Sequence, residues 1–174
     1  MTVDDYLKLD EAGVFGTERT ELLDGTVIIM NAEDRPHGWV RDELTYRLRR
    51  ALDDLGSPLS TISASTRLSD HDMPLPDIVL TSEPMGDGPV PVPSIGLVVE
   101  VSSTTLRRDA GVKATAYASA NIPEYWIANL KGRVIRQFWG PRDGVYTQRR
   151  DIPFGEPVDA VTIEGLSIAT ETIR

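Results

Sequence analysis

The sequence of 174 residues has a hydrophobic fraction of 40% and no cysteine, which fits one globular domain over residues 1–174 and excludes disulfides and thiolate metal sites. The formal net charge of −9 argues against broad, sequence-independent affinity for nucleic acid. No apolar run has the roughly 20 residues of a membrane span. The acidic N-terminus lacks an export signal, so we expect a cytoplasmic protein with no membrane partner.

The first part of the chain alternates helical and strand patterns. Residues 3–10 have the spacing of a short amphipathic helix. Residues 21–30 predict a hairpin, because an Asp-Gly pair between apolar runs is typical of a type I′ turn. Apolar residues at helical spacing predict a helix over 37–55, which Gly56 ends, and a strand is expected over 59–68.

The second part predicts a sheet built around one central strand. Residues 77–81 are apolar and β-branched, a proline-rich loop follows at 83–94, and the apolar run 95–102 indicates a strand buried on both faces. An alanine-rich helix is expected over 109–120. Further strands are expected at 124–129, 133–139 and 145–150, with turns at 131–132 and 141–144 and a short apolar segment at 161–173. This order predicts an α/β or α+β fold with helices on the faces of a sheet.

Two of the predicted strands each carry one carboxylate, Asp77 at the start of its strand and Glu100 within the central strand. Leaving buried carboxylates unpaired costs several kcal/mol per ion, so we expect a cation between them. Asp109, Lys113 and Tyr117 share one helix face, and folding that helix onto the sheet brings Lys113 toward Glu100. The simpler alternative is an ordinary Asp109–Lys113 pair on a helix surface, worth ~0.3–0.5 kcal/mol.

Several short motifs occur in an order that resembles a known family. In chain order they are Glu21-Leu-Leu-Asp-Gly, His37, Pro76-Asp77, Glu100-Val-Ser-Ser, Asp109 with Lys113, Tyr117-Ala, and Ile122-Pro-Glu-Tyr-Trp-Ile. From about Val3 to the C-terminus, the chain resembles the Uma family of putative restriction endonucleases, which belongs to the PD-(D/E)XK nuclease superfamily. The resemblance implies a restriction-endonuclease-like core, in which helices flank a mixed β-sheet.

The resemblance also implies a metal site. Its ligands fall on Asp77, Glu100 and the backbone carbonyl of Val101. The implied cofactor is Mg²⁺ or Mn²⁺, since hard divalent ions prefer oxygen ligands. Such an ion lowers the pKa of a bound water and neutralises the charge of a phosphate.

The remaining catalytic residues follow from the same resemblance. Ser102 stands where superfamily members usually have a lysine, and Lys113 in the next helix fits as its replacement. Glu21 resembles the additional acid that many members bring from the N-terminal part. With Asp77, Glu100, Lys113 and Glu21 as catalytic residues, the implied activity is a magnesium-dependent endonuclease that hydrolyses phosphodiester bonds, with DNA as the expected partner.

Contacts to the substrate are expected from two places in the chain. Residues 131–150 hold six bases and one acid, so they can form a basic face, although a solvated hairpin with ordinary surface arginines explains the same pattern. The candidate substrate-binding residues are His37, Ser102, Arg133, Arg136 and Arg149. Because cutting both strands of a duplex needs two copies of a one-site domain, we expect a homodimer.

Two other functions fit the sequence. One is a catalytically silent binding or assembly module that keeps the nuclease fold, which the net charge of −9 favours. The other is a metal-dependent hydrolase of a different phosphoester. The set of two acids and one lysine favours the nuclease over the silent module.

Overall fold

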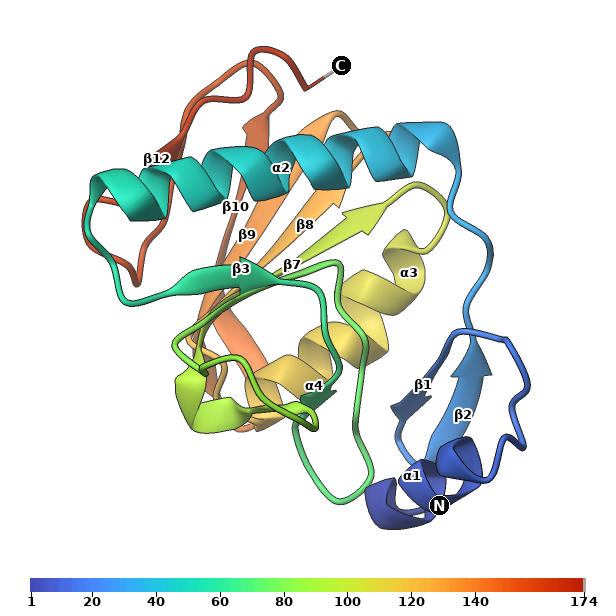
Figure 1. The fold of residues 1–174 in the computed structure, drawn as a ribbon. Helices are drawn as coiled ribbons and strands as arrows, with labels where there is room; N and C mark the ends of the chain where they lie inside the picture. The colour runs from blue at the N-terminus through green and yellow to red at the C-terminus, as the bar shows by residue number, and fades with distance from the viewer. Residues whose placement is uncertain (174) are drawn as a thin grey trace.

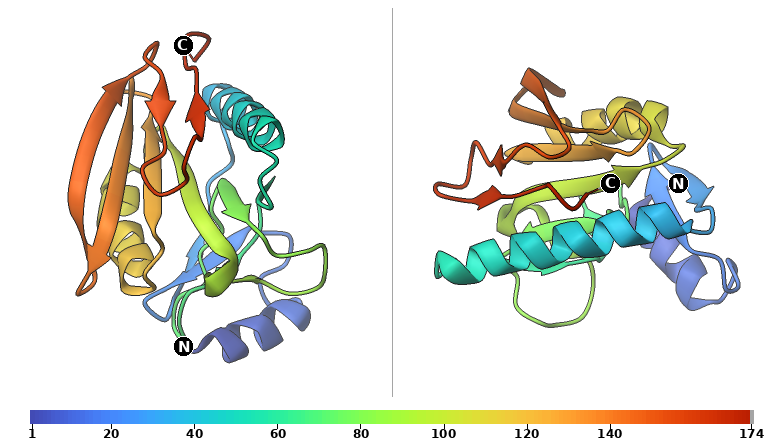
Figure 2. Two further views of the ribbon diagram at one scale, coloured as in Figure 1. Left: turned by 90° about the vertical axis from the view of Figure 1, so that its left-hand side faces the viewer. Right: turned by 90° about the horizontal axis from the view of Figure 1, so that it is seen from above.

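The computed structural model describes residues 1–173 and places helices on both faces of a six-stranded sheet, as Figures 1 and 2 show. The strand order is β10-β9-β8-β7-β5-β3, with β7 and β8 parallel and the other neighbouring strands antiparallel. The strands are β3 (Ser60–Ile62), β5 (Ile78–Thr81), β7 (Ile95–Ser102), β8 (Glu124–Asn129), β9 (Val134–Arg142) and β10 (Val145–Pro153). The mixed sheet flanked by helices predicted from the sequence is therefore confirmed.

One face of the sheet is covered by the long helix α2 (Arg35–Asp54), seen above the sheet in Figure 1. Asp34 caps the helix by accepting a hydrogen bond of 2.9 Å from the His37 amide. Apolar side chains of α2 pack on the strands together with the C-terminal strands β11 (Val158–Asp159) and β12 (Ser167–Ile168). This packing fixes the first turn of α2 beside the end of β7, where the polar pocket described below opens.

The opposite face is covered by the connection between the parallel strands β7 and β8 (Figure 2). It consists of α3 (Leu106–Arg108), a π-helical turn, η2 (Asp109–Lys113), and α4 (Ala114–Ser119). The predicted helix over 109–120 is corrected in two ways, because helical structure begins at Leu106 and contains this wider turn. Single π-turns inside helices are rare overall, and those that exist are frequently found at functional sites.

The N-terminal residues form a small unit beside the sheet edge, at the lower right of Figure 1. It contains α1 (Val3–Glu11) and the hairpin of β1 (Thr20–Leu23) and β2 (Thr26–Ile29). The predicted Asp-Gly turn is present, with positive φ angles of 48° at Asp24 and 68° at Gly25. Reciprocal backbone bonds of 3.1 and 2.8 Å between Leu22 and Met73 dock the hairpin, so the residue before Leu22 faces the protein interior.

Three local predictions need correction. The strand expected over 59–68 is split, because β5 begins only at Ile78 and leaves the chain after β3 without a partner; β4 (Thr66–Arg67) pairs instead with β6 (Val90–Pro91). The loop expected over 83–94 therefore contains β6 and the short 3₁₀ helix η1 (Val92–Ser94). The turn expected at 141–144 narrows to Asp143 and Gly144, both with positive φ, and β9 continues to Arg142.

None of the helices within residues 1–173 combines the length and apolar character that crossing a membrane requires.

Candidate active site

Asp77 and Glu100 both line a pocket of about 280 Å³ at the end of the central strands. Asp77 immediately precedes β5, and its Oδ2 accepts a hydrogen bond of 2.7 Å from the Val101 amide on β7. The amide and carbonyl of a strand residue point to the same side, so the Val101 carbonyl is also directed toward Asp77. The pairing of β5 with β7 ends at Val99, which leaves this carbonyl outside that ladder.

Glu100 points away from the helix α2 and toward the crossover helices. Strand alternation places its neighbours Val99 and Val101 in the core beneath α2, as the sequence predicted. Its Oε1 accepts hydrogen bonds from Lys113 Nζ at 2.8 Å and from the Tyr117 hydroxyl at 2.9 Å. Its Oε2 accepts no hydrogen bond from any of residues 1–173. One oxygen is thus fixed in place and the other is free to bind a ligand.

Lys113 lies between two buried acids. Its Nζ is 3.0 Å from Glu21 Oε2 as well as 2.8 Å from Glu100 Oε1, and its side chain is only 1% exposed. The Leu75 amide also donates to Glu21 Oε2, at 3.3 Å. Glu21 Oε1 is buried and has no partner within the described chain. The sequence also allowed a simpler explanation, an ordinary ion pair between Asp109 and Lys113 on a helix surface. This ion pair is not found among the described residues.

The charges of this group are set by burial and by their mutual contacts. Burial raises the pKa of Glu100 to about 8, although the neighbouring Lys113 acts to lower it. Burial acts to lower the pKa of Lys113, but the carboxylates of Glu100 and Glu21 outweigh it and raise that pKa above its usual value. Lys113 is therefore protonated at neutral pH and acts as a cation and hydrogen-bond donor.

Asp109 is a further buried carboxylate in the pocket, at the start of the π-turn. Its Oδ2 accepts a hydrogen bond of 2.5 Å from Thr105, and burial raises its pKa. The Tyr125 hydroxyl donates to the Asp109 backbone carbonyl at 3.1 Å. These contacts anchor the turn that carries Lys113 toward Glu21 and Glu100.

Comparisons with known proteins identify the family and the fold of the chain. A family model described as "Uma2: Putative restriction endonuclease" matches residues 3–171. The chain belongs to the Uma2 family. The crystal structure of a protein named as a putative nuclease belonging to DUF820, from Anabaena variabilis ATCC 29413, has the same fold, with a TM-score of 0.74 at 12% identity over 99% of this chain and 97% of that one. No curated protein matches.

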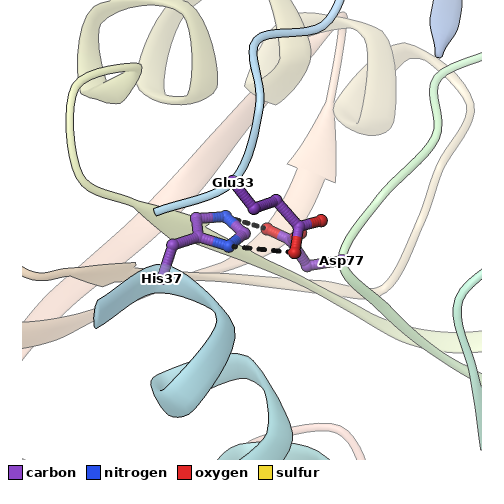
Figure 3. A group of neighbouring side chains, drawn as sticks. All are labelled: Glu33, His37 and Asp77. Atoms are coloured by element: carbon purple, nitrogen blue, oxygen red, sulfur yellow. Dashed lines mark ion pairs between the residues drawn. The ribbon is translucent and has the colours of Figure 1, made fainter. Parts of the chain in front are cut away.

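His37 of this Uma2 chain lines the pocket from the first turn of α2. Its ring points toward Glu33 and Asp77, as Figure 3 shows. Its Nε2 is 3.3 Å from Asp77 Oδ2, and its Nδ1 is 4.0 Å from Glu33 Oε2. Burial acts to raise the pKa of Asp77, but the hydrogen bond and charge of His37, the Val101 amide and the charge of Lys113 together outweigh burial and lower that pKa. The same bond raises the pKa of His37. A ligand atom from each of Glu33, His37 and Asp77 lies within 4.8 Å of the others.

The other expected substrate contacts do not meet at this pocket. Ser102 is 1% exposed and is not one of the residues that line it. Arg136 forms two hydrogen bonds of 2.8 Å to Asp151, and Arg133 lies over the Phe154 ring. Arg149 is exposed on β10, which is separated from β7 by β8 and β9, or about 14 Å at the usual strand spacing.

Sequence reasoning missed several residues that line the Uma2 pocket, among them Glu33 and Arg108. Glu33 lies four residues before His37 and just before the start of α2 at Arg35. The helix expected from the sequence begins only at His37, so the sequence pattern does not place the two side chains next to each other. Arg108 lines the pocket from the end of α3. It carries no motif of its own, so only the folded arrangement identifies it.

Proposed function

We propose that this Uma2 chain is a magnesium-dependent endonuclease that hydrolyses phosphodiester bonds in DNA. The observation that carries the proposal is the union, in one pocket, of Asp77, Glu100 and a protonated Lys113 that is held by Glu21. Membership of a family of putative restriction endonucleases supports a nuclease function. The structural neighbour supports the fold that such a function would use.

The donor atoms around Asp77 fit a hard divalent cation. Glu100 Oε2 has no hydrogen-bond partner within residues 1–173, and Val101 directs its carbonyl to the same place. Oxygen ligands of this kind suit Mg²⁺ or Mn²⁺. Asp77, Glu100 and the Val101 carbonyl would hold the ion, which would activate a water and neutralise charge on the scissile phosphate when bound.

The protein's own groups supply position and charge. Two N–H groups of Lys113 are taken by Glu21 and Glu100, which leaves the third to donate to the attacking water or to a phosphate oxygen. Because its pKa is raised, Lys113 is a poor proton acceptor at neutral pH, so we assign it orientation and transition-state stabilisation and not base catalysis. His37 holds Asp77 through its Nε2 and keeps that carboxylate turned into the pocket.

A nicking assay on supercoiled plasmid tests the proposal. With Mn²⁺ or Mg²⁺ the parent protein should convert the plasmid to open-circular form, and EDTA should stop it. Glu100→Gln should lower the rate by at least about 100-fold. Glu83→Gln removes an exposed carboxylate beyond the other end of β5 and should leave the rate unchanged.

Absence of nicking would leave the two alternatives. A catalytically silent module, which the net charge of −9 favours, would cut no phosphoester at all. A hydrolase of another phosphoester would leave the plasmid intact but release nitrophenol from a bis(nitrophenyl) phosphate in a metal-dependent manner. The homodimer and the cytoplasmic location expected from the sequence stay predictions.

A further inference from the structure

The pocket contains one cation that differs from the others in its contacts. Its cationic side chains are Arg19, His37, Arg108 and Lys113. Arg19 is 2.7 Å from a Glu33 oxygen, and His37 and Lys113 are bound to carboxylates as described above. The Arg108 guanidinium donates no hydrogen bond to any atom of residues 1–173, and its Nε is buried.

Arg108 faces two acids without bonding to either. Its Nε is 3.9 Å from Glu21 Oε1 and 4.0 Å from Asp109 Oδ1, beyond hydrogen-bond distance in both cases. Glu21 Oε1 is buried and also unpartnered within the described chain. Buried polar atoms are nearly always paired, so two that face each other unpaired indicate that each has another ligand.

Neutralisation of the acids alone does not explain this arrangement. A flexible arginine that only compensated Glu21 would close the gap of 3.9 Å, because the hydrogen-bonded pair is the stronger one. The side chain is 28% exposed, so it is more accessible from solvent than Lys113, which is 1% exposed at the base of the pocket. Arg108 is thus the pocket cation that reaches solvent while its guanidinium donates no hydrogen bond to the described residues, whereas Arg19 is already bonded to Glu33.

A guanidinium with free donors has a specific chemistry. Its planar fork matches two oxygens of a phosphate, and this pairing is both charge-assisted and directional. The pocket is also lined by the carboxylates of Glu33 and Asp77, which repel a polyanion, and the whole chain carries a net charge of −9. A free cation at the pocket is what an acidic protein needs to bring a phosphodiester to such acids.

We propose that Arg108 binds the non-bridging oxygens of the nucleic-acid phosphate that enters this pocket. The inference rests on the proposed function, because it assumes the same substrate. It makes Arg108 a substrate-binding residue, and it places the principal phosphate contact on the crossover helix α3 beside the carboxylates. The basic residues of the β9–β10 hairpin are then secondary contacts.

The test compares Arg108→Gln with Arg107→Gln, its exposed neighbour, which does not line the pocket. Binding of a fluorescent DNA duplex is followed by anisotropy in EDTA, so that hydrolysis plays no part. Arg108→Gln should weaken binding about 10-fold and reduce the salt slope by about one, whereas Arg107→Gln should change the affinity less than about twofold. Arg108→Lys should restore the salt slope but not the full affinity, since it keeps the charge and loses the fork.

Circular dichroism and thermal melts of the same variants show whether they are folded. Equal losses of affinity in both glutamine variants, or none in either, would overturn the assignment. So would a lower melting temperature of Arg108→Gln with parental affinity, because that result means charge compensation of Glu21 and Asp109. A parent that binds DNA through Arg108 but does not nick plasmid refutes the proposed hydrolysis alone. A parent that nicks, with an Arg108→Gln variant that binds normally, refutes this inference alone.

Discussion

Two buried glutamates on neighbouring parallel strands have opposite surroundings. Glu100 on β7 faces the crossover helices, and Glu124 on β8 faces the side covered by α2 and the C-terminal strands. Glu124 Oε1 accepts from Trp126 and Gln137, and its Oε2 accepts from the amides of residues 161 and 162 and from the Thr162 hydroxyl, at 2.6–3.2 Å. Its bonds thus join β8 and β9 to the C-terminal segment.

The difference lies in the unused oxygens and not in burial. Glu124 is 0% exposed and Glu100 is 4% exposed, so both residues are buried. Both oxygens of Glu124 are occupied, whereas Glu100 Oε2 and Glu21 Oε1 have no hydrogen-bond partner within residues 1–173. A buried carboxylate whose two oxygens both accept hydrogen bonds links parts of the fold. A buried carboxylate with one oxygen left without a partner indicates a ligand that the protein itself does not supply.

Removal of the cation between Glu21 and Glu100 should have the largest effect. Lys113→Met leaves Glu21 and Glu100 facing each other, so the free energy of unfolding should fall by about 3–5 kcal/mol at pH 8 and by less at pH 5, where Glu100 is protonated. Nicking should be abolished, while Mn²⁺ should still raise the melting temperature. Lys131→Met, in an exposed turn, is the control. Unchanged stability would mean that Lys113 does not compensate these acids.

Glu124→Gln should have the second largest effect. The free energy of unfolding should fall by about 2–4 kcal/mol at pH 7, because the new amide group faces donors and leaves backbone amides unpaired. The loss should be the same with and without Mn²⁺, and nicking by the folded fraction should be normal. Urea unfolding followed by tryptophan fluorescence measures it. A metal-dependent loss would show that the two glutamates are not separate in function.

Glu100→Gln should change the free energy of unfolding in the opposite direction and stabilise the metal-free protein. Burial raises the pKa of Glu100 from 4.5 to about 8, so the folded metal-free protein holds a proton that the unfolded chain releases above pH 4.5. The stability from this proton is complete below pH 4.5 and is lost as pH rises toward 8. The variant does not titrate, so at pH 8 it should be more stable by about 2 kcal/mol, or about 4–8 °C in melting temperature.

Melts of parent and Glu100→Gln between pH 5 and pH 8.5 in EDTA should therefore diverge as the pH rises. Added Mn²⁺ should raise the melting temperature of the parent more than that of the variant, since a ligand of the folded state stabilises by mass action. Curves that stay parallel across this range would show that Glu100 is ionised without metal. Equal responses to Mn²⁺ would remove Glu100 from the ligands.

The smallest effects are expected at the β9–β10 hairpin. Replacing Arg133, Arg136 and Arg149 together by glutamine should weaken DNA binding a few-fold at low salt and flatten its salt dependence. Arg136→Gln alone should act mainly on stability, by up to about 1 kcal/mol, because it is paired with Asp151. Unchanged affinity of the triple variant would remove the hairpin from the interface.

Local rules were sufficient for the parts of the pocket that depend on strand and helix periodicity. Alternation along β7 put Glu100 opposite its valine neighbours, and the helix spacing brought Lys113 toward it, as the structure has them. Glu21 followed from resemblance, since nothing in the hairpin pattern says that its side chain meets Lys113. The catalytic roles of these residues stay predictions until the variants are measured.

The remainder depended on contacts between distant segments. The π-turn is invisible in the sequence, because a spacing of four residues from Asp109 to Lys113 fits an ordinary helix equally well. The end of β3 depends on where its partner β5 begins, and the free donors of Arg108 depend on how α3 docks beside Glu21. Such features are properties of packing and are not encoded in any single segment.

The docking of the N-terminal hairpin has a consequence for the order in which the protein is made. Glu21 leaves the ribosome early, whereas Lys113, its partner at 3.0 Å, belongs to the crossover that follows β3, β5 and β7 and precedes the other three strands of the sheet. Closing the loop between them costs entropy that only the packed sheet repays. A chain synthesised only as far as the hairpin therefore has Glu21 in water and no assembled pocket, so the pocket is complete only after the crossover has packed on the sheet.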